Sequence, residues 1–148
     1  MLKGLPPTIP PQLLYVLANM GHGETLLVCD RNHPAPGVAR TSVHGGIIDL
    51  AGLDVPGAIA EILKLLPLDT FIPAPIQRMQ VVGKPDEVLS IFDEVQTIAD
   101  AAEHRAVGIE PLERFAFYAE GRKVHAVVRT SDHRPYACFI LTKGVIFP

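Results

Sequence analysis

Residues 54–102, DVPGAIAEILKLLPLDTFIPAPIQRMQVVGKPDEVLSIFDEVQTIADAA, contain two helical patterns separated by a strand pattern. Asp54 can cap a helix that extends to about residue 66, because its apolar positions recur at i, i+3, i+4 and i+7. Residues 85–102 keep the same period, and residues 77–82 between the two helices suit a strand. These residues therefore predict a helix–strand–helix unit with two core-facing helices.

Further patterns on both sides of this unit complete the fold prediction. Residues 12–20 read as a helix that is apolar around most of its circumference, so we expect it to be covered on two sides. Residues 26–29 suit a buried strand, and residues 124–130 and 136–141 suit two more. Helices that alternate with strands predict an α/β fold, a layered α/β/α single domain over residues 1–148 with a mixed, largely buried sheet.

Composition narrows the classes of partner and the compartment. The formal charge of −3 comes from 13 basic and 16 acidic residues without long runs of either sign, so we expect no nucleic acid and no membrane partner. No signal-peptide core and no bilayer-length apolar stretch occur, which predicts a cytoplasmic protein. Cys29 and Cys138 lie in apolar strand-like runs and are expected to be reduced, buried thiols.

Generic motifs for cofactors and nucleophiles are absent from the chain. There is no phosphate-binding glycine loop, no dinucleotide-binding glycine pattern and no Gly-x-Ser-x-Gly serine elbow. His22, His33 and His44 recur every eleven residues, but no cysteine doublet or His-Glu-x-x-His helix accompanies them. We therefore expect neither a metal nor an organic cofactor.

Four polar residues at element boundaries are the candidates for chemistry. His22 lies between Gly21 and Gly23, just before a buried strand, where an imidazole can exchange a proton near neutral pH or simply cap a helix end. Asp30 follows that strand and could bind a ligand or bond its own turn. Arg114 could be a surface ion-pair partner and Tyr136 an ordinary strand aromatic.

Short motifs in a fixed order along the chain resemble one known family. They are PQLL at 11–14, MGHGE at 20–24, LLPLDT at 65–70, ERFAFY at 113–118 and KGV at 143–145. Together they are similar to the fucose mutarotase and ribose pyranase family, closest to its fucose mutarotase branch, over nearly the whole chain. The resemblance implies an isomerase that interconverts the anomers and ring forms of a free monosaccharide such as L-fucose or D-ribose.

The resemblance also implies roles for particular residues and an assembly. His22 corresponds to the family's histidine in Gly-His-Gly and is expected to transfer the proton. Separately, the alternating helix and strand pattern leads us to expect that the segment 21–30 opens onto one pocket. A ring-shaped homo-oligomer, commonly a decamer, with sites near subunit boundaries is expected too. The substrate-binding residues that the family implies are Asp30, Arg114, Tyr136, Ala137 and Cys138.

Two departures from the family keep other functions open. Glu24 stands where the family usually has aspartate, and Ala137-Cys138 replaces its Gly-Asn. The second departure also suits a sugar-binding accessory protein of uptake or regulation that catalyses nothing. A metal-dependent hydrolase or lyase that uses His22, Asp30 and His33 is the third reading.

Overall fold

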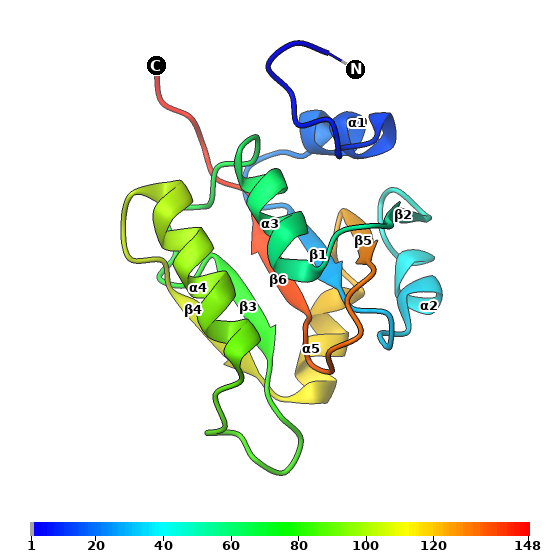
Figure 1. The fold of residues 1–148 in the computed structure, drawn as a ribbon, viewed down its shortest axis with the longest axis vertical. Helices are drawn as coiled ribbons and strands as arrows, with labels where there is room; N and C mark the ends of the chain where they lie inside the picture. The colour runs from blue at the N-terminus through cyan, green and yellow to red at the C-terminus, as the bar shows by residue number, and fades with distance from the viewer. Residues whose placement is uncertain (1) are drawn as a thin grey trace.

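A single six-stranded sheet organises the chain, in a computed structural model that describes residues 2–148 (Figure 1). The expected domain starts at Met1, which lies outside the described residues. Helices and strands alternate along most of the sequence. In chain order they are α1 Pro11–Asn19, β1 Thr25–Cys29, α2 Ala35–Ala39, β2 Ile47–Leu50, α3 Val55–Leu63, β3 Ile76–Met79, α4 Ser90–Glu103, β4 Ile109–Leu112, α5 Arg114–Gly121, β5 Ala126–Thr130 and β6 Phe139–Thr142.

The sheet is mixed, as expected, because one central strand runs against the others. Its order is β2-β5-β1-β6-β3-β4. Strands β2, β5 and β1 pair in parallel, as do β3 and β4, whereas β6 pairs antiparallel with both β1 and β3. The carboxyl ends of the five parallel strands therefore meet the amino end of β6 at one edge of the sheet.

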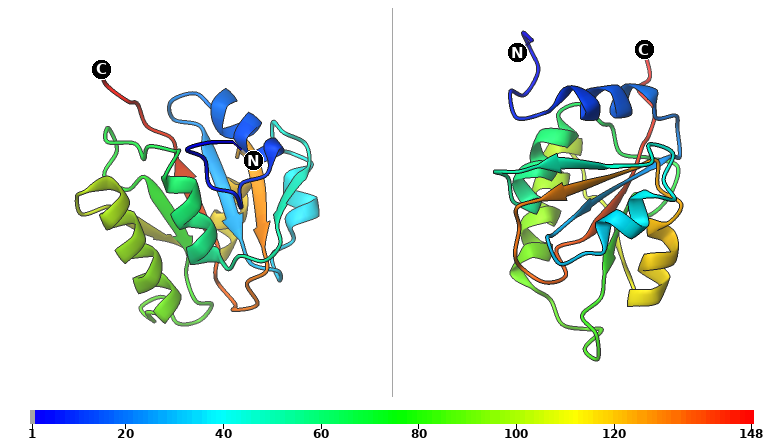
Figure 2. Two further views of the ribbon diagram at one scale, coloured as in Figure 1. Left: turned by 45° about the horizontal axis from the view of Figure 1, so that its top comes forward. Right: turned by 90° about the vertical axis from the view of Figure 1, so that its right-hand side faces the viewer.

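Helices cover both faces of the sheet, which confirms the layered α/β/α arrangement (Figure 2). On β1, Leu26 and Val28 join a core cluster with α1, α3 and α4, whereas Leu27 and Cys29 join a second cluster with α2 and α5. Alternate residues of a strand point to opposite faces, so β1 supplies both cores. Four of its five residues are buried, consistent with a strand covered on both sides.

The predicted helices and strands are present with shifted ends. Asp54 caps α3 by accepting from the Gly57 N–H at 2.9 Å. Helix α4 begins at Ser90 rather than near residue 85, because residues 84–87 form a turn in which the Glu87 N–H donates to the Lys84 carbonyl. Elements α2, β2, β4 and α5 were not predicted. The two unpredicted strands are the edges of the sheet, where a strand needs little apolar sequence.

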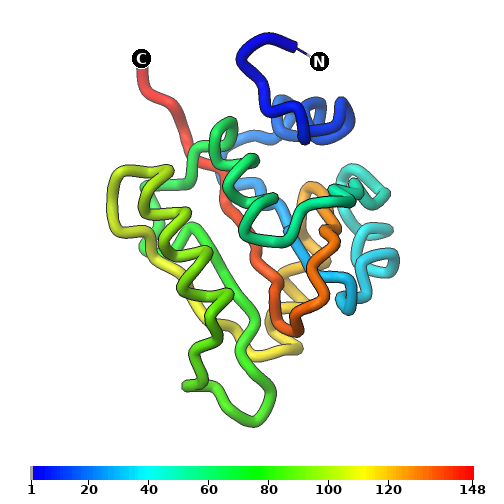
Figure 3. The backbone as a smooth tube through the Cα atoms, in the orientation of Figure 1, coloured from blue at the N-terminus to red at the C-terminus, as the bar shows by residue number. Residues whose placement is uncertain are grey.

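Helix α1 is covered on one face only within a single chain. Leu13, Val16 and Leu17 are buried against the core, whereas Tyr15 on the other face is 67% exposed. The expected second covering would therefore have to come from outside this chain. The smooth backbone trace shows α1 at the same end of the molecule as both termini, opposite the loop that joins β3 to α4 (Figure 3). None of the helices in residues 2–148 is long and apolar enough to cross a membrane.

Candidate functional site

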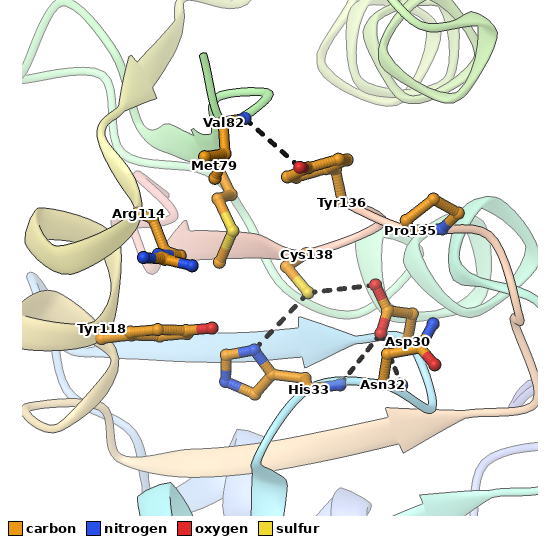
Figure 4. Close-up of a pocket in the computed structure, with 10 residues that line it drawn as sticks. All are labelled: Asp30, Asn32, His33, Met79, Val82, Arg114, Tyr118, Pro135, Tyr136 and Cys138. Carbon is orange, nitrogen blue, oxygen red and sulfur yellow. Dashed lines mark hydrogen bonds between the residues drawn. The ribbon is translucent and has the colours of Figure 1, made fainter.

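A pocket of about 240 Å³ lies at the edge where the carboxyl ends of the parallel strands meet the start of β6 (Figure 4). Ligands of open α/β sheets bind at this edge, because the loops there diverge. Its volume is below the roughly 300–1,000 Å³ of sites for drug-sized ligands, which suits a small molecule. The lining residues are Asp30, Asn32, His33, Met79, Val82, Arg114, Tyr118, Pro135, Tyr136 and Cys138.

Asp30 occupies the floor of this pocket, directly after β1, and is only 2% exposed. Its Oδ1 accepts from the N–H groups of Asn32 at 2.7 Å and His33 at 3.0 Å, a side-chain turn that fixes the carboxyl group. Burial raises the pKa of Asp30, and the hydrogen bonds it accepts from Asn32 and other groups oppose that rise. The result is a rigid carboxyl group that can accept bonds from ligand hydroxyls.

Cys138 and His33 form a buried chain with the second oxygen of Asp30. The Cys138 thiol donates to Asp30 Oδ2 at 3.4 Å, and its sulfur lies 3.6 Å from His33 Nδ1. Burial lowers the pKa of His33 to about 4 and raises that of Cys138 well above its usual value, so both are neutral near pH 7. Ala137 is fully buried and is not among the residues that line the pocket, but its backbone helps to lower the pKa of Asp30.

Arg114 and Tyr118 reach the pocket from α5, four residues apart and thus on one face of the helix. Glu113 caps this helix by accepting from the N–H groups of Phe115 at 2.8 Å and Ala116 at 3.2 Å. The Arg114 guanidinium carbon lies 4.5 Å from the centre of the Phe115 ring, and its buried Nε has no hydrogen-bond partner. This guanidinium is therefore available to donate to a ligand.

Tyr136 and two apolar side chains form the opposite wall. Tyr136 has a left-handed backbone, with φ of 64°, and its hydroxyl oxygen accepts from the Val82 N–H at 3.3 Å. Met79 and Val82 present apolar surface beside it (Figure 4). A ligand here would meet apolar side chains on one side and hydrogen-bonding groups on the other. A small ring molecule with an apolar face and polar groups around its edge fits this arrangement.

His22 lies at the other end of β1, so the expectation that 21–30 opens onto one pocket is wrong for a single chain. The five residues of β1 separate His22 from Asp30, and a strand of that length spans roughly 17 Å. The His22 side chain is 46% exposed, with Nε2 3.2 Å from Oδ1 of the buried Asp69. The Phe71 ring lies 5.1 Å from the imidazole, between ring centres.

Asp69 is itself held in place at this second location. Its Oδ1 also accepts from the Phe71 N–H at 3.0 Å, and its backbone carbonyl accepts from Arg105 Nη2 at 3.2 Å. A fixed carboxylate that binds one imidazole nitrogen selects the tautomer and orientation of the ring. His22 and Asp69 therefore form an oriented pair on the surface.

The three residues that would bind a metal in a hydrolase or lyase are not close together in this structure. His22 stands apart from Asp30 and His33, which line the pocket at the opposite end of β1. Within residues 2–148, no group of three His, Cys, Asp or Glu side chains is arranged to hold a metal ion. The three residues named for that reading therefore do not form a metal site in one chain.

Two residues with a place in these sites, Tyr118 and Asp69, were not chosen from the sequence, and His33 was named only as a possible metal ligand. His33 follows Asp30 by three positions, the spacing of a side-chain turn, and that spacing could have indicated its place beside Asp30. Tyr118 follows Arg114 by one helical turn, but the helix itself was not predicted. Asp69 is distant from His22 in sequence, and only the fold brings the two together.

Comparison with known proteins gives consistent matches over the whole chain. A family model described as "RbsD / FucU transport protein family" matches residues 3–146. The human (Homo sapiens) protein named fucose mutarotase is 37% identical over 148 aligned residues, which cover 98% of this chain and 94% of that protein.

Two solved structures share the fold closely. FucU from Bifidobacterium longum has a TM-score of 0.90 at 34% identity and covers 98% of this chain and 100% of its own. The fucose mutarotase from Streptococcus pneumoniae, solved in complex with L-fucose, has a TM-score of 0.88 at 33% identity, with 99% and 100% of the two chains covered.

Proposed function

Because this chain belongs to the RbsD / FucU family, we propose that it is a monosaccharide mutarotase or pyranase, an isomerase that interconverts the anomers and ring forms of a free sugar. The observation that carries the proposal is the pocket at the carboxyl edge of the sheet, with Asp30, Arg114 and Tyr136 around it. L-Fucose and D-ribose are the sugars proposed, since relatives are named for the first and the resemblance includes pyranases acting on the second.

The pocket side chains suit a neutral sugar. Asp30 Oδ2 can accept from a hydroxyl, Arg114 can donate to ring or hydroxyl oxygens, and the Tyr136 hydroxyl can do both. Met79 and Val82 can pack on the less polar face of the ring. We assign Asp30, Arg114, Tyr136 and Cys138 to the substrate, with Ala137 contributing through its backbone.

His22 is the group proposed to move the proton. Ring opening removes a proton from the anomeric hydroxyl, breaks the bond from the anomeric carbon to the ring oxygen and adds a proton to that oxygen. The Asp69 carboxylate can only accept, so it holds the hydrogen on His22 Nε2 and leaves Nδ1 free to exchange a proton. General acid–base chemistry of this kind needs no cofactor.

A ring-shaped homo-oligomer, decameric by the family resemblance, would reconcile the two separated locations. Proton transfer needs hydrogen-bond contact with the sugar, and one chain holds His22 and Asp30 at opposite ends of β1. The surface beside His22 carries exposed Phe71 and Phe147, whose ring centres lie 6.3 Å apart. This apolar surface supports a contact in which His22 of one copy meets the pocket of another.

The test combines sugar exchange with subunit mixing. Saturation-transfer NMR on equilibrating fucose, ribose and galactose should show faster anomer exchange with the protein. Asp30→Ala and His22→Ala proteins, each inactive, should regain activity when their subunits are mixed, because about a quarter of the sites would then combine both native residues. No acceleration for any sugar would reject the isomerase. Acceleration without complementation would reject the shared site.

A sugar-binding accessory protein is the second candidate, and the Cys138 thiol favours it. That thiol already engages Asp30 Oδ2, one of the oxygens that a sugar hydroxyl would use. Binding of a sugar without accelerated exchange in the same NMR experiment would establish this candidate.

We also infer a cytoplasmic location, which the free thiols of Cys29 and Cys138 support because reducing compartments keep thiols unpaired.

A further inference from the structure

The segment that carries His22 is a tight turn between α1 and β1. The Glu24 N–H donates to the Gly21 carbonyl at 3.2 Å, which closes a four-residue turn with His22 and Gly23 at its centre. Gly23 has φ of +81°, the left-handed value found at the third position of a type II turn, which glycine adopts without strain. The backbone therefore presents His22 at a defined point of the surface.

Lys143 holds both sides of this turn through its backbone and its side chain. Its carbonyl accepts from the Gly23 N–H and its N–H donates to the Glu24 carbonyl, both at 2.9 Å. Its ammonium group donates to the carbonyls of Leu17 and Met20 at the end of α1. These bonds fix the end of the helix and the start of the strand. None of them involves the N–H of Gly21, the residue before His22.

The Glu24 side chain supplies that remaining contact. Its Oε2 accepts from the Gly21 N–H at 2.6 Å, while its Oε1 lies 3.0 Å from Nδ1 of His125. The Gly21 N–H above all, and then His125, lower the pKa of Glu24, so the carboxylate is ionised and accepts both bonds. One carboxylate thus ties the first residue of the turn to an imidazole across the sheet.

His125 is a rigid anchor for this carboxylate. Its backbone N–H donates to the Thr25 carbonyl at 2.8 Å, and its carbonyl accepts from the His44 N–H at 2.9 Å. Its side chain is 10% exposed, so the imidazole has little freedom to turn away. The glutamate side chain is long enough for its two oxygens to reach Gly21 and His125 together.

We propose that Glu24 and His125 are positioning residues that hold the Gly21–Glu24 turn, and with it His22, in the orientation needed for proton transfer. The proposal rests on the proposed function of His22. Neither residue touches the pocket at the other end of β1. Loss of this network should therefore slow the proton-transfer step and leave sugar binding unchanged.

The variants separate the hydrogen bond from the packing of the ring. His125→Phe keeps a ring and removes the donor, whereas His125→Asn places an amide N–H near the position of Nδ1. Glu24→Gln removes the charge from the other partner. Glu120→Gln is the matched control, because Glu120 has a similar side-chain exposure, 39% against 40%, and pairs with Lys123 at 2.7 Å away from this turn.

Saturation-transfer NMR at a series of sugar concentrations gives kcat and KM for each protein. We expect His125→Phe and Glu24→Gln to lower kcat about two- to tenfold, the effect of one lost hydrogen bond, with KM unchanged. His125→Asn and Glu120→Gln should stay near the native kcat. The double variant should be no slower than the slower single one, because both changes break one network. A native kcat for His125→Phe, or equal losses for His125→Phe and His125→Asn, would overturn the proposal.

A second measurement keeps this proposal separate from the proposed function. Hydrogen–deuterium exchange by mass spectrometry of the peptide around Gly21 reports the turn directly, whether or not any sugar reacts. Exchange should become faster in His125→Phe and Glu24→Gln but not in Glu120→Gln. If the native protein accelerates no sugar, the proposed function fails, yet faster exchange would still support the positioning network. Unchanged exchange in both variants would overturn it.

Discussion

The two ends of β1 differ in the burial of their polar side chains and in the groups that bond to them. At the carboxyl end, Asp30 is 2% exposed and bonded to its own turn and to Cys138, inside a pocket. At the amino end, the His22 side chain is 46% exposed, and Asp69 holds it from below. The first end is a closed set of groups that can bind a ligand. The second is an oriented imidazole on an open surface, the group proposed to transfer the proton.

Under the proposed function, one reaction is divided between these two locations of a small chain. Burial fixes the binding groups but also makes the carboxyl of Asp30 harder to ionise. The His22 imidazole is accessible from outside the chain, as its proposed role in proton transfer to a sugar requires. The following predictions test the division, in order of decreasing expected effect.

Replacement of His22 tests the amino end most strongly. His22→Ala should lower the rate of anomer exchange by about 10²- to 10⁴-fold, the usual contribution of a positioned proton-transfer group. The fold should survive, because the side chain is half exposed and packs little. Saturation-transfer NMR measures the rate, and circular dichroism checks the fold. An unchanged rate in the folded variant would assign proton transfer to another residue.

Burial of His33 predicts a pH dependence of stability that originates at the carboxyl end. Its pKa is about 4 in the folded chain and about 6.5 when unfolded, so the unfolded chain binds more protons between these values. Stability should therefore fall as pH drops from about 6.5 to 4, by up to about 3 kcal/mol from this residue. Urea unfolding at fixed protein concentration gives the free energy of unfolding at each pH, and this energy should fall less steeply with decreasing pH in His33→Leu than in the native protein. The same dependence on pH in both proteins would contradict the prediction.

Gly144 tests the packing that supports Asp69 at the amino end. A Cβ at this position would lie 2.5 Å from the Leu68 carbonyl oxygen and 2.8 Å from the Asp69 Cα. Gly144→Ala should destabilise the fold by about 1–3 kcal/mol, as overpacking does. The control is Gly46→Ala, where a Cβ meets nothing within 4 Å. Urea unfolding compares the two, and equal free energies of unfolding would contradict the crowding.

Cys138 tests the selectivity of the pocket and has the smallest expected effect. In Cys138→Asn, an amide replaces the thiol beside Asp30 and can bond a sugar hydroxyl more strongly. We expect apparent affinity for fucose or ribose to rise about two- to tenfold, the value of one net hydrogen bond. Cys29→Ala, outside the pocket lining, is the control. The measurement is the NMR exchange rate at a series of sugar concentrations, which gives the apparent affinity. Unchanged affinities would mean that residue 138 only fills the core.

The predictable part of the fold is the part with strong local signals. Asp54 is a preferred capping residue and marks the start of α3, and the buried run of β1 needs apolar sequence on both faces. Helix α5 was missed because its cap, Glu113, is not a residue that commonly marks a helix start. Strand β4 contains Pro111, which sheets accept at an edge and sequence patterns usually exclude.

The site was predictable residue by residue but not as an arrangement. Asp30, Arg114, Tyr136 and Cys138 line one pocket, whereas Ala137, which was named with them, does not, and substrate binding by all five stays a prediction. His22 does not line it, because the seven residues between His22 and Asp30 include the extended strand β1, which holds the two side chains apart. The length of the predicted strand, at about 3.4 Å per residue, would already have indicated that His22 and Asp30 lie far apart. The pairing of His22 with a distant aspartate depends on tertiary structure that local patterns do not contain.

Strand β6 runs between both locations and sets the spacing between them. Its first neighbours, Tyr136 and Cys138, belong to the pocket, and Lys143 just beyond its last residue holds the turn of His22. Inserting or deleting one residue in β6 would displace one of these ends by about 3.4 Å and turn alternate side chains to the wrong face. The residue count of β6 therefore fixes the distance between the pocket and the turn that carries His22.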